Sequence, residues 1–474
     1  MYPRRVASAL LQMGNRRGLI EMTCARLFHS FCSFILLTCM ISLFFISKTD
    51  AASTSEHQQG INRLSVKKCI EIALSKNLKI VQAKLEKQAK GLSAKASFKD
   101  MLPKLSTQYT YIGRRDVNTV TIFGTKVRLS SHDNYDWQLI LSQPIFQGGA
   151  LWNRYKAAKI DYDMSESQLR QIANDIVRQV KEAYFTVLQA RRILQEQKDS
   201  VKRLEAHLRD AEGFFKVGLI AKNDLLQSRV ELSQARQQLI TAKHDLELAE
   251  ARLNLILRQD LTTPLNLSDT LHEVSLKTSL ARLTEHALSH RPEVTAGQLA
   301  VKKAQRELKL AKASYLPRID FNATYEKRGI TPDVSDYPFG DHDMAQIMLN
   351  ATWELWAWGQ TRDQVGAAAK TLLAAKAALR DVKDEIRIQV TEAWLRFKEA
   401  KENVKVAKTA LDQAEENFRL NTQRYKEQLA TSTDVLDAEA LLSRARTSYF
   451  NAIAQELIAK ARLDYATGKP IEEK

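Results

Sequence analysis

Residues 169–215 read LRQIANDIVRQVKEAYFTVLQARRILQEQKDSVKRLEAHLRDAEGFF and carry two interleaved apolar series, each repeating every seven residues. One series begins at Leu169 and the other at Val180, so that steps of four and three residues alternate along the chain. This alternation is typical of a coiled coil, in which one seam of a helix packs against a partner. The polar exception is Gln197. We therefore predict one unbroken helix over 150–215, roughly 100 Å long at about 1.5 Å per residue.

The coil is expected to fold back on itself. Residues 217–220 (VGLI) interrupt the seven-residue pattern, which restarts at Leu232 and continues to Ile256 with leucine and alanine interleaved. This second stretch predicts a return helix over 224–258. Residues 150–258 then form a single long helical hairpin.

The same design returns 210 residues later. Phe215 corresponds to Tyr425, Asp224 to Asp434, and Leu226 to Leu436. Because 425 − 215 = 210 is a multiple of seven, both copies share one heptad register. An internal duplication means that the chain builds one unit twice. We assign a first structural repeat to 61–262, a linker to 263–278, a second repeat to 279–468 and a short tail to 469–474.

Composition agrees with long helices. The 474 residues could form two or three domains, and they include only 16 Gly and 9 Pro. The formal net charge is +16. Because the first residues resemble an export signal, we expect this basic surface to face anionic lipid or an acidic partner rather than nucleic acid.

The first fifty residues differ in character from the rest. Five arginines precede the apolar run Phe31–Ile46, which Asp50 and two alanines follow. This order predicts a signal peptide over 1–52. An uncleaved N-terminal membrane anchor is the alternative, although the run is short for a spanning helix. Removal of the leader leaves Cys69 as the single cysteine, so no disulfide can form within the exported chain, and we predict an inert buried thiol.

Two shorter helical segments, 64–101 and 280–315, come before the strands of each copy. Each ends at a Leu-Pro pair, because the residue before proline is pushed out of the helical region. Pro292 is expected to split the second segment, and a matching break is expected near Asn77. Placed end to end with the return helix, such segments match the long helix in length and form the second wall of each hairpin.

After these helices the apolar period changes to two. Four strands of about ten residues are predicted, apolar on one face and mostly polar on the other, a length that crosses a bilayer when tilted. Two soluble hairpins lying on the coil remain an alternative. The strands cover about 105–111, 135–142, 319–325 and 345–355, with polar loops at 112–133 and 327–343.

Aromatic residues and glycines mark the ends of these strands. Tryptophan is enriched at bilayer interfaces, which favours the membrane interpretation for Trp137, Trp353 and Trp356. Glycine permits the sharp turn from the last strand of each copy into the long helix. The predicted hinge residues are Gly148, Gly149 and Gly359.

Four strands cannot close a barrel in lipid, where open edges are not tolerated. Other copies of the chain must complete it, and three copies would supply 12 strands. The predicted fold class is therefore mainly α with a transmembrane β-barrel contribution. Each chain holds a duplicated strand hairpin and coiled-coil hairpin, and the trimer forms a 12-stranded barrel continued by a helical periplasmic tunnel.

This order of elements resembles the TolC-like outer membrane efflux proteins over about residues 61–468. The short motifs are Leu102-Pro103, the FQGG run at 146–149 and the GLI run at 218–220. The resemblance implies a homotrimer in the outer membrane of a Gram-negative bacterium, with a long periplasmic domain. It also implies a periplasmic adaptor (membrane fusion) protein and an inner-membrane pump or ABC transporter as partners. The expected function is export of solutes or polypeptides through an iris-like gate at the coiled-coil tip.

The resemblance also assigns residues to that gate. Asp434 and Asp437 match the aspartate ring at the channel constriction, and they lie three residues apart, on one helix face. Tyr425 and Asp224 match a hydrogen bond that holds the gate closed. The basic residue that normally adds a second link is replaced by Ala430. Helix capping by Asp224 and Asp434, and simple packing by Tyr425, are the alternatives.

No catalytic, cofactor-binding or metal-ligating motif is found, so the protein is not expected to be an enzyme or to carry a cofactor. The nine histidines lack zinc-protease spacing, and serine-triad and phosphate-loop signatures are missing from the sequence. The competing hypothesis is a periplasmic coiled-coil adaptor anchored by its N-terminus. Two equal copies that each pair strands with a coil argue against it.

Overall fold

The structure, a computed structural model, describes residues 63–273 and 278–469. The predicted signal peptide, 1–52, lies outside the described residues. The predicted tail also lies outside them, except for Lys469.

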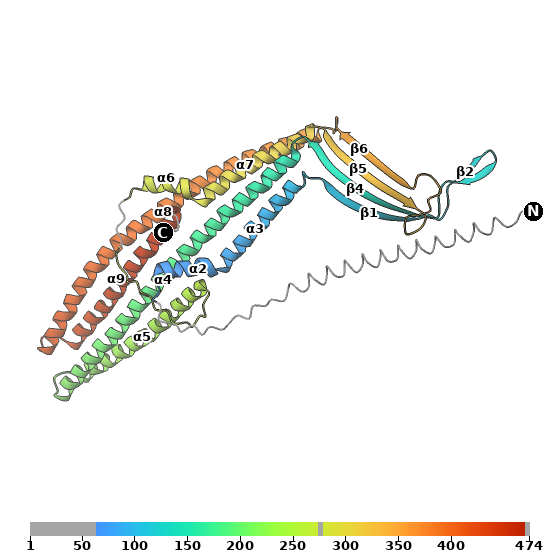
Figure 1. The fold of residues 1–474 in the computed structure, drawn as a ribbon. Helices are drawn as coiled ribbons and strands as arrows, with labels where there is room; N and C mark the ends of the chain where they lie inside the picture. Colours follow the sequence, from blue (N-terminus) through green and yellow to red (C-terminus); the bar gives the residue numbers. More distant parts are fainter. Residues whose placement is uncertain (1–62, 274–277, 470–474) are drawn as a thin grey trace, which may run out of the picture. The chain divides into compact units, whose positions relative to one another are not determined.

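Two long helical hairpins dominate the described chain (Figure 1). The first pairs α4 (Ala150–Lys216) with α5 (Lys222–Leu257), and the second pairs α8 (Gln360–Lys426) with α9 (Ser432–Ala466). Both α4 and α8 run unbroken for 67 residues. The predicted coiled-coil hairpins are therefore confirmed.

The seven-residue seam is the part of each helix that packing hides from water. In the first hairpin, α4 buries Ile176, Val180, Val187, Leu204 and Ala211. Facing them, α5 buries Leu232, Ala235, Ala242, Ala249 and Leu253. The alternation of leucine and alanine lets the two helix axes approach closely while apolar area is still buried.

Short helices form the rest of the wall along each long helix. In the first repeat these are α2 (Val66–Lys76) and α3 (Leu78–Lys99). In the second they are α6 (Leu280–His290) and α7 (Pro292–Lys312), followed by a 3-10 turn, η1 (Ala313–Tyr315). The expected break is confirmed at Asn77, whose side chain accepts a hydrogen bond from the Lys79 amide at 2.9 Å and so caps α3. Pro292 occupies the first turn of α7, where proline is tolerated.

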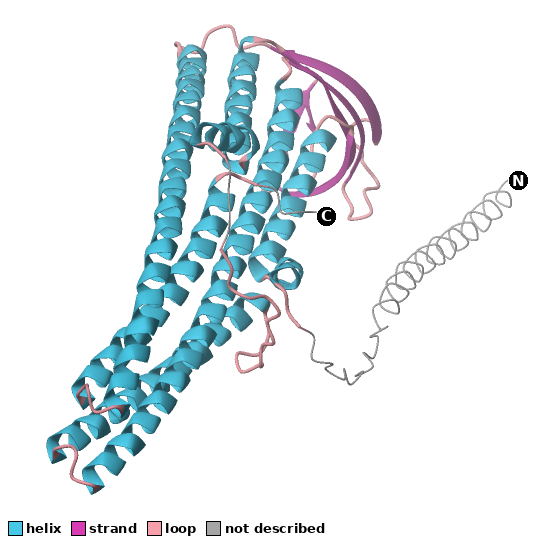
Figure 2. Ribbon diagram, turned by 90° about the vertical axis from the view of Figure 1, so that its left-hand side faces the viewer, coloured by secondary structure: helices cyan, strands magenta, loops and turns pink. Residues whose placement is uncertain are grey.

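Helix α4 is shared by both repeats. It packs against α3 and α5 of its own repeat and against α7 and α9 of the other, and Figure 2 shows the helices running side by side. Among the described helices, none combines the length and the apolar character needed to cross a bilayer.

The linker is fastened to the first repeat near Tyr184, whose side chain is fully buried. The Tyr184 hydroxyl lies 2.8 Å from Asp269 Oδ2 and 2.9 Å from the Leu64 carbonyl oxygen. Cys69 is buried in the same core cluster. Burial, with a smaller effect of Asp269, raises the pKa of the Cys69 thiol to about 11, so it stays protonated near neutral pH.

One end of the helical body continues into a four-stranded antiparallel sheet (Figure 1). The strands follow the order β1 (Lys104–Gly113), β4 (Asp133–Gln147), β5 (Arg318–Gly329) and β6 (Asp343–Thr352). The pairs β1–β4 and β5–β6 each belong to one repeat, and β4–β5 pairing joins the repeats. Within the described chain, β1 and β6 each keep one unpaired edge.

Strand register gives this sheet two different faces. One row of directly paired residues across all four strands is Leu105, Leu141, Ala323 and Ile347. The neighbouring row, on the opposite face, is Ser106, Ile140, Thr324 and Gln346. The first face is apolar yet exposed, with 68% of Leu105 and 76% of Ile347 accessible to solvent. The predicted alternation is therefore confirmed, and Ile140 is the apolar exception on the mostly polar face.

Two details of the strand predictions were wrong. The loop 112–133 contains a second, two-stranded sheet, β2 (Thr119–Ile122) paired with β3 (Thr125–Arg128). Strands of four residues are too short to produce a clear period-two signal. The last strand ends at Thr352, not near 355, because the chain leaves the ladder at Trp353, whose indole nitrogen donates to the Tyr315 carbonyl oxygen at 3.1 Å.

Candidate functional site

The two hairpin turns lie at the end of the coils opposite the sheet (Figure 1). In the second turn Thr431 is the N-cap of α9, and the Asp434 carboxylate accepts a hydrogen bond from the Thr431 amide at 2.8 Å. In the first turn the corresponding N-cap is Ala221, which has no side-chain oxygen. The capping alternative is thus corrected: neither aspartate is an N-cap, and only Asp434 takes part in a capping box.

The predicted constriction residues share one exposed face of α9. Asp434 and Asp437 are both exposed, whereas Val435, Leu436 and Ala438 between and beside them are buried. Hydrogen bonds from the Thr431 amide and hydroxyl hold the pKa of Asp434 below its usual value. Asp434 is therefore ionised near neutral pH and points away from its own chain's core.

Tyr425 is buried, with 3% of its surface exposed. Its ring packs against His207 and Phe214 of α4, at centroid distances of 5.0 and 5.4 Å. Its hydroxyl lies close to the Ser432 hydroxyl, and within the described chain it makes no hydrogen bond of good geometry. Burial raises the pKa of Tyr425, with smaller contributions from the carboxylates of Asp210 and Asp224, although the Ser432 hydroxyl opposes them. The structure thus brings Tyr425 near Asp224, and their predicted hydrogen bond stays a prediction for the assembled protein.

The contact between the two hairpins, where α4 meets α9, is largely polar near the tip. We call it the polar seam; it comprises Glu196, Ser200, Arg203 and His207 on α4 and Ser432, Glu439 and Arg446 on α9. The α4 members follow each other at steps of four, three and four residues, and the α9 members at steps of seven. These are the spacings of one helix face, so the two stripes meet along antiparallel helices.

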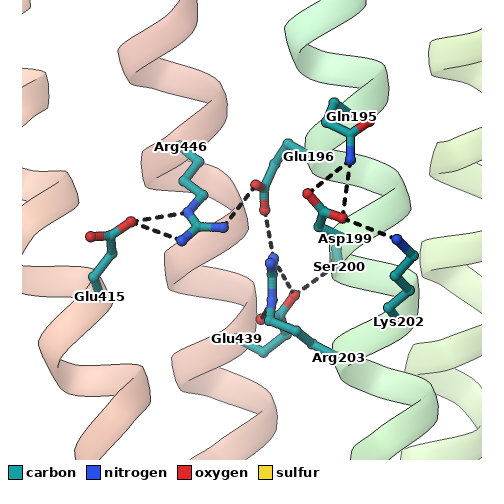
Figure 3. Close-up of polar contacts among 9 residues, drawn as sticks. All are labelled: Gln195, Glu196, Asp199, Ser200, Lys202, Arg203, Glu415, Glu439 and Arg446. Carbon is teal, nitrogen blue, oxygen red and sulfur yellow. Dashed lines mark hydrogen bonds and ion pairs between the residues drawn. The ribbon is translucent and has the colours of Figure 1, made fainter.

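Arg203 lies at the centre of the polar seam (Figure 3). It donates to Glu196 Oε1 at 2.5 Å and to Glu439 Oε2 at 2.7 Å. Ser200 donates to the other Glu439 oxygen at 2.6 Å. Arg446 extends the chain of ion pairs from Glu196, at 3.2 Å, to Glu415 of α8, at 2.8 Å (Figure 3). One network therefore ties α4, α8 and α9 together.

Burial of the charges in this network costs free energy, because the charged groups lose their hydration. Glu196 and Glu439 are each only 3% exposed. Burial raises the pKa of Glu439 although Arg203 and Ser200 oppose the shift, so the ion pair does not fully offset the loss of hydration. A contact of this kind specifies how two helices meet. Its charged groups are hydrated again when the helices separate, so little free energy is lost on separation.

His207 continues the polar seam toward the tip. Its Nε2 lies 2.9 Å from the Ser432 hydroxyl, which lies 3.2 Å from the Ser228 hydroxyl of α5. All three side chains are buried. Burial lowers the pKa of His207 below its usual value of 6.5, although the Asp210 carboxylate opposes this shift. The imidazole is therefore neutral in this packed arrangement near pH 7.

The predicted hinge glycines adopt left-handed backbone conformations immediately before the long helices. Gly148 and Gly149 have φ of 58° and 79°, and Gly359 has φ of 86°. Trp358, at the position of Gly148 in the second copy, also has positive φ, 50°. A Cβ at Gly148 would lie 2.7 Å from the Ala313 carbonyl oxygen, whereas nothing lies within 4 Å of one at Gly359. The close approach of η1 explains why only the first copy needs two glycines.

The predicted interface aromatics lie at both ends of the sheet. Trp137, near the loop end of β4, packs edge to face against Tyr325 of β5, with ring centroids 6.1 Å apart. Trp353 and Trp356 follow β6 at the helix end and are 59% and 72% exposed. Their role at a bilayer interface stays a prediction.

The polar seam was not predicted from the sequence. Gln197 was noticed as a polar exception, but its neighbours Glu196, Ser200, Arg203 and His207 were not recognised as a stripe. Their helical spacing is the signal that could have revealed them. Their α9 partners could not be assigned, because more than 220 positions separate His207 from Ser432 in sequence.

Comparison with known proteins gives a consistent result. A family model described as "Outer membrane efflux protein" matches residues 69–257 and 283–469. The outer membrane efflux protein BepC of Brucella suis is 23% identical over 331 residues, which cover 69% of this chain and 71% of BepC. The outer membrane protein TolC of Escherichia coli is 24% identical over 386 residues, which cover 78% of this chain and 75% of TolC.

Solved structures share the fold. The outer membrane protein VceC of Vibrio cholerae aligns with a TM-score of 0.73 at 16% identity, covering 86% of this chain and 97% of VceC. The CmeC outer membrane channel of Campylobacter jejuni aligns with a TM-score of 0.71 at 16% identity, covering 85% of each chain.

Replacing Arg203 with methionine should loosen the contact between α4 and α9, because it leaves the buried carboxylates of Glu196 and Glu439 without their shared partner. Removing one member of a buried ion pair typically costs about 3–5 kcal/mol. Amide hydrogen exchange in 432–446 should therefore accelerate by roughly 100-fold or more, since each 1.4 kcal/mol is about tenfold. The matched control is Arg396→Met, in an exposed ion pair with Glu392 on α8, where about 0.5 kcal/mol or less is expected. Equal exchange in both variants would contradict the assigned importance of Arg203.

The packing of His207 should make the tip sensitive to acid. A histidine with a lowered pKa stabilises the packed state above its ordinary pKa, and this contribution is lost as pH falls below about 6.5 toward the lowered value. Exchange protection in 432–439, corrected for the intrinsic pH dependence of exchange, should decrease from pH 7.5 to 5.5. His207→Gln can still bond Ser432 but cannot titrate, so its protection should be flat over this range. The same loss of protection in His207→Gln would assign the effect to a titrating group other than His207.

Proposed function

Since the chain belongs to the outer membrane efflux protein family, with matched segments in both repeats, we propose that it is the outer-membrane channel of a tripartite efflux or type I secretion system. The observation that carries this proposal is the sheet, in which four strands in register present one exposed apolar face and one polar face. A sheet with these faces fits a bilayer on one side and a water-filled lumen on the other.

The unpaired edges of β1 and β6 support assembly of several chains. Each edge carries backbone N–H and C=O groups that cannot stay unpaired in lipid, so β6 of one chain would pair with β1 of the next. Three chains would close a barrel of 12 strands. The helical hairpins of the three chains would then continue the barrel as a tunnel on the periplasmic side.

The coiled-coil tips would form the gate of this tunnel. Three copies of Asp434 and Asp437, on the exposed face of α9, would ring the constriction with carboxylates and attract cations. The gate hydrogen bond would join Tyr425 and Asp224 on assembly. The polar seam would take the place of the missing basic link at Ala430, because its arginines connect the two hairpins of one chain.

A polar seam also suits a gate that must open. Within each hairpin the helices share an apolar seam, whose separation would expose apolar area to water. Between the hairpins, separation would return partly compensated charges to water, which offsets much of the lost pairing. We therefore expect each hairpin to move as a unit.

The partners implied are a periplasmic adaptor and an inner-membrane pump or ABC transporter. The protein would supply the conduit and no chemistry, and the cargo would be solutes or polypeptides selected by the pump. The competing adaptor hypothesis is disfavoured by the sheet, since a periplasmic domain has no reason to leave Leu105 and Ile347 exposed on one continuous apolar face.

The conduit proposal is tested by the mass of the native particle. Protein extracted with detergent from the outer-membrane fraction should contain three chains per particle by light scattering, and it should lack residues 1 to about 52. It should also form conducting pores in planar bilayers, because a closed barrel encloses a lumen. A monomeric or soluble periplasmic protein, or one that keeps its leader in the inner membrane, would overturn the proposal in favour of the adaptor.

The double variant Asp434→Asn with Asp437→Asn should reduce the cation selectivity of the pore and its block by divalent cations. Asparagine at 434 keeps an oxygen that can accept from the Thr431 amide, so the capping box is preserved while the charge is removed. The control is Asp384→Asn on α8, an exposed aspartate far from the tip in the chain. Unchanged selectivity and unchanged divalent block in the double variant would remove Asp434 and Asp437 from the constriction.

A further inference from the structure

The β2–β3 hairpin is a part of the molecule that the conduit does not use. The chain passes from α3 through β1 to this hairpin and returns through β4 to α4, so the hairpin lies at the end of the sheet away from the helices. Figure 1 shows it projecting beyond the sheet. Its base is ordered by two hydrogen bonds, from the Leu129 amide to the Asn118 carbonyl at 2.7 Å and from the Asn118 amide to the Ser130 hydroxyl at 2.9 Å.

The register of the hairpin makes it amphipathic. Val120 pairs with Val127, and Ile122 pairs with Thr125. Directly paired residues share a face, so these side chains form an apolar face. The alternate pairs, Thr119 with Arg128 and Thr121 with Lys126, place two cations and two hydroxyls on the opposite face.

The apolar face ends in an unusual turn. Phe123 has a left-handed φ of 47° and is fully exposed, and Gly124 follows with φ of 83°. A bulky residue in this conformation is uncommon, because the position favours glycine or asparagine. Val120, Ile122 and Val127 are 39–49% exposed in the described chain. Two short strands with these side chains in water are only marginally stable, and burial of the apolar face against a partner surface would stabilise them.

The net charge of the hairpin and its flanking loop indicates what kind of surface would cover the apolar face. Residues 114–132 contain four cations, Arg114, Arg115, Lys126 and Arg128, against the single carboxylate of Asp116, a net charge of 4 − 1 = +3. An apolar edge backed by cations matches the boundary between acyl chains and phosphate headgroups, where arginine and lysine reach toward the phosphates. The sheet that carries the hairpin already has an exposed apolar face, so both would meet the same bilayer.

We propose that the β2–β3 hairpin lies in the outer leaflet of the membrane around the barrel, with Ile122 and Phe123 at the acyl boundary and Lys126 and Arg128 on phosphate groups. This inference rests on the proposed function, which places the sheet in the outer membrane. It assigns the hairpin to a phosphate-bearing lipid surface rather than to cargo or to a neighbouring copy. The hairpin would fix the barrel's depth and orientation in the bilayer.

The test uses nitroxide labels on single introduced cysteines in the protein isolated from the outer membrane without its leader (residues 1 to about 52), reconstituted in vesicles. Ile122→Cys reports the apolar face, and Thr121→Cys, one residue earlier, is the matched control on the cationic face. Cys69 is buried with a raised pKa, so it should stay unlabelled, and the unsubstituted protein checks this. The label at 122 should collide with oxygen more often than with a water-soluble nickel chelate, by several-fold relative to the label at 121.

Lipid charge separates the electrostatic part of the inference. In vesicles of phosphatidylcholine with phosphatidylglycerol, the label at 122 should be more fully immersed than in phosphatidylcholine alone. Lys126→Gln with Arg128→Gln should lower the ratio of membrane-bound to free hairpin by roughly 30-fold in the anionic vesicles, taking about tenfold per 1.4 kcal/mol and about 1 kcal/mol per cation. An unchanged ratio would overturn the role of the cations.

Two other outcomes would overturn the whole inference. Equal exposure of labels 121 and 122 to the nickel chelate would leave the hairpin in water. Dipolar broadening between labels at 122, present in detergent as well as in lipid, would assign the apolar face to a neighbouring copy. In each case, particles that still contain three chains and conduct ions would show that only the hairpin assignment has failed, not the conduit.

Discussion

The edges of the four-stranded sheet impose the strictest requirement on this chain. In lipid, each backbone N–H and C=O group of β1 and β6 must find a partner, and the described chain supplies partners on only one side of each strand. The apolar row through Leu105 and Ile347 makes water an equally poor surrounding for the same sheet. A single copy of this sheet would therefore leave backbone groups unpaired in lipid and apolar side chains exposed in water. The duplication follows the same logic, since β4–β5 pairing removes two edges within one chain and leaves one edge at each end.

The helical body contains two kinds of contact between helices, apolar within each hairpin and polar between the hairpins. Leucine and alanine hold each hairpin together through burial of apolar area. Ion pairs and hydroxyls define where α4 meets α9, and their raised and lowered pKa values show that burial opposes their charged forms. The interface that must be specific is thus built from interactions that give modest net stability.

Much of this arrangement was predictable, because it follows from periodicity. A seven-residue apolar repeat is sufficient to place α4 and α8, and a two-residue repeat gives both the strands and their faces. The local chemistry of Asn77 and Pro292 is sufficient to predict the helix breaks at these residues. The β2–β3 hairpin was missed because strands of four residues carry little periodic signal and because its turn uses Phe123-Gly124 rather than Asn-Gly. The polar seam was missed for another reason: its partners belong to different repeats, and periodicity says nothing about which stripe meets which.

The two strand-to-helix junctions have unequal mechanical consequences. At Gly148 the chain is wedged against the Ala313 carbonyl oxygen, so even one added carbon would collide there. At Trp358 and Gly359 the surroundings are open, and a full indole is accommodated. Each junction begins a helix of 67 residues, which is about 100 Å long. Rotation of such a helix by only a few degrees at the junction would move its far end by several ångströms. The steric contact at Gly148 thus restricts rotation of α4 at its junction, whereas the open surroundings of Trp358 and Gly359 leave α8 less restricted.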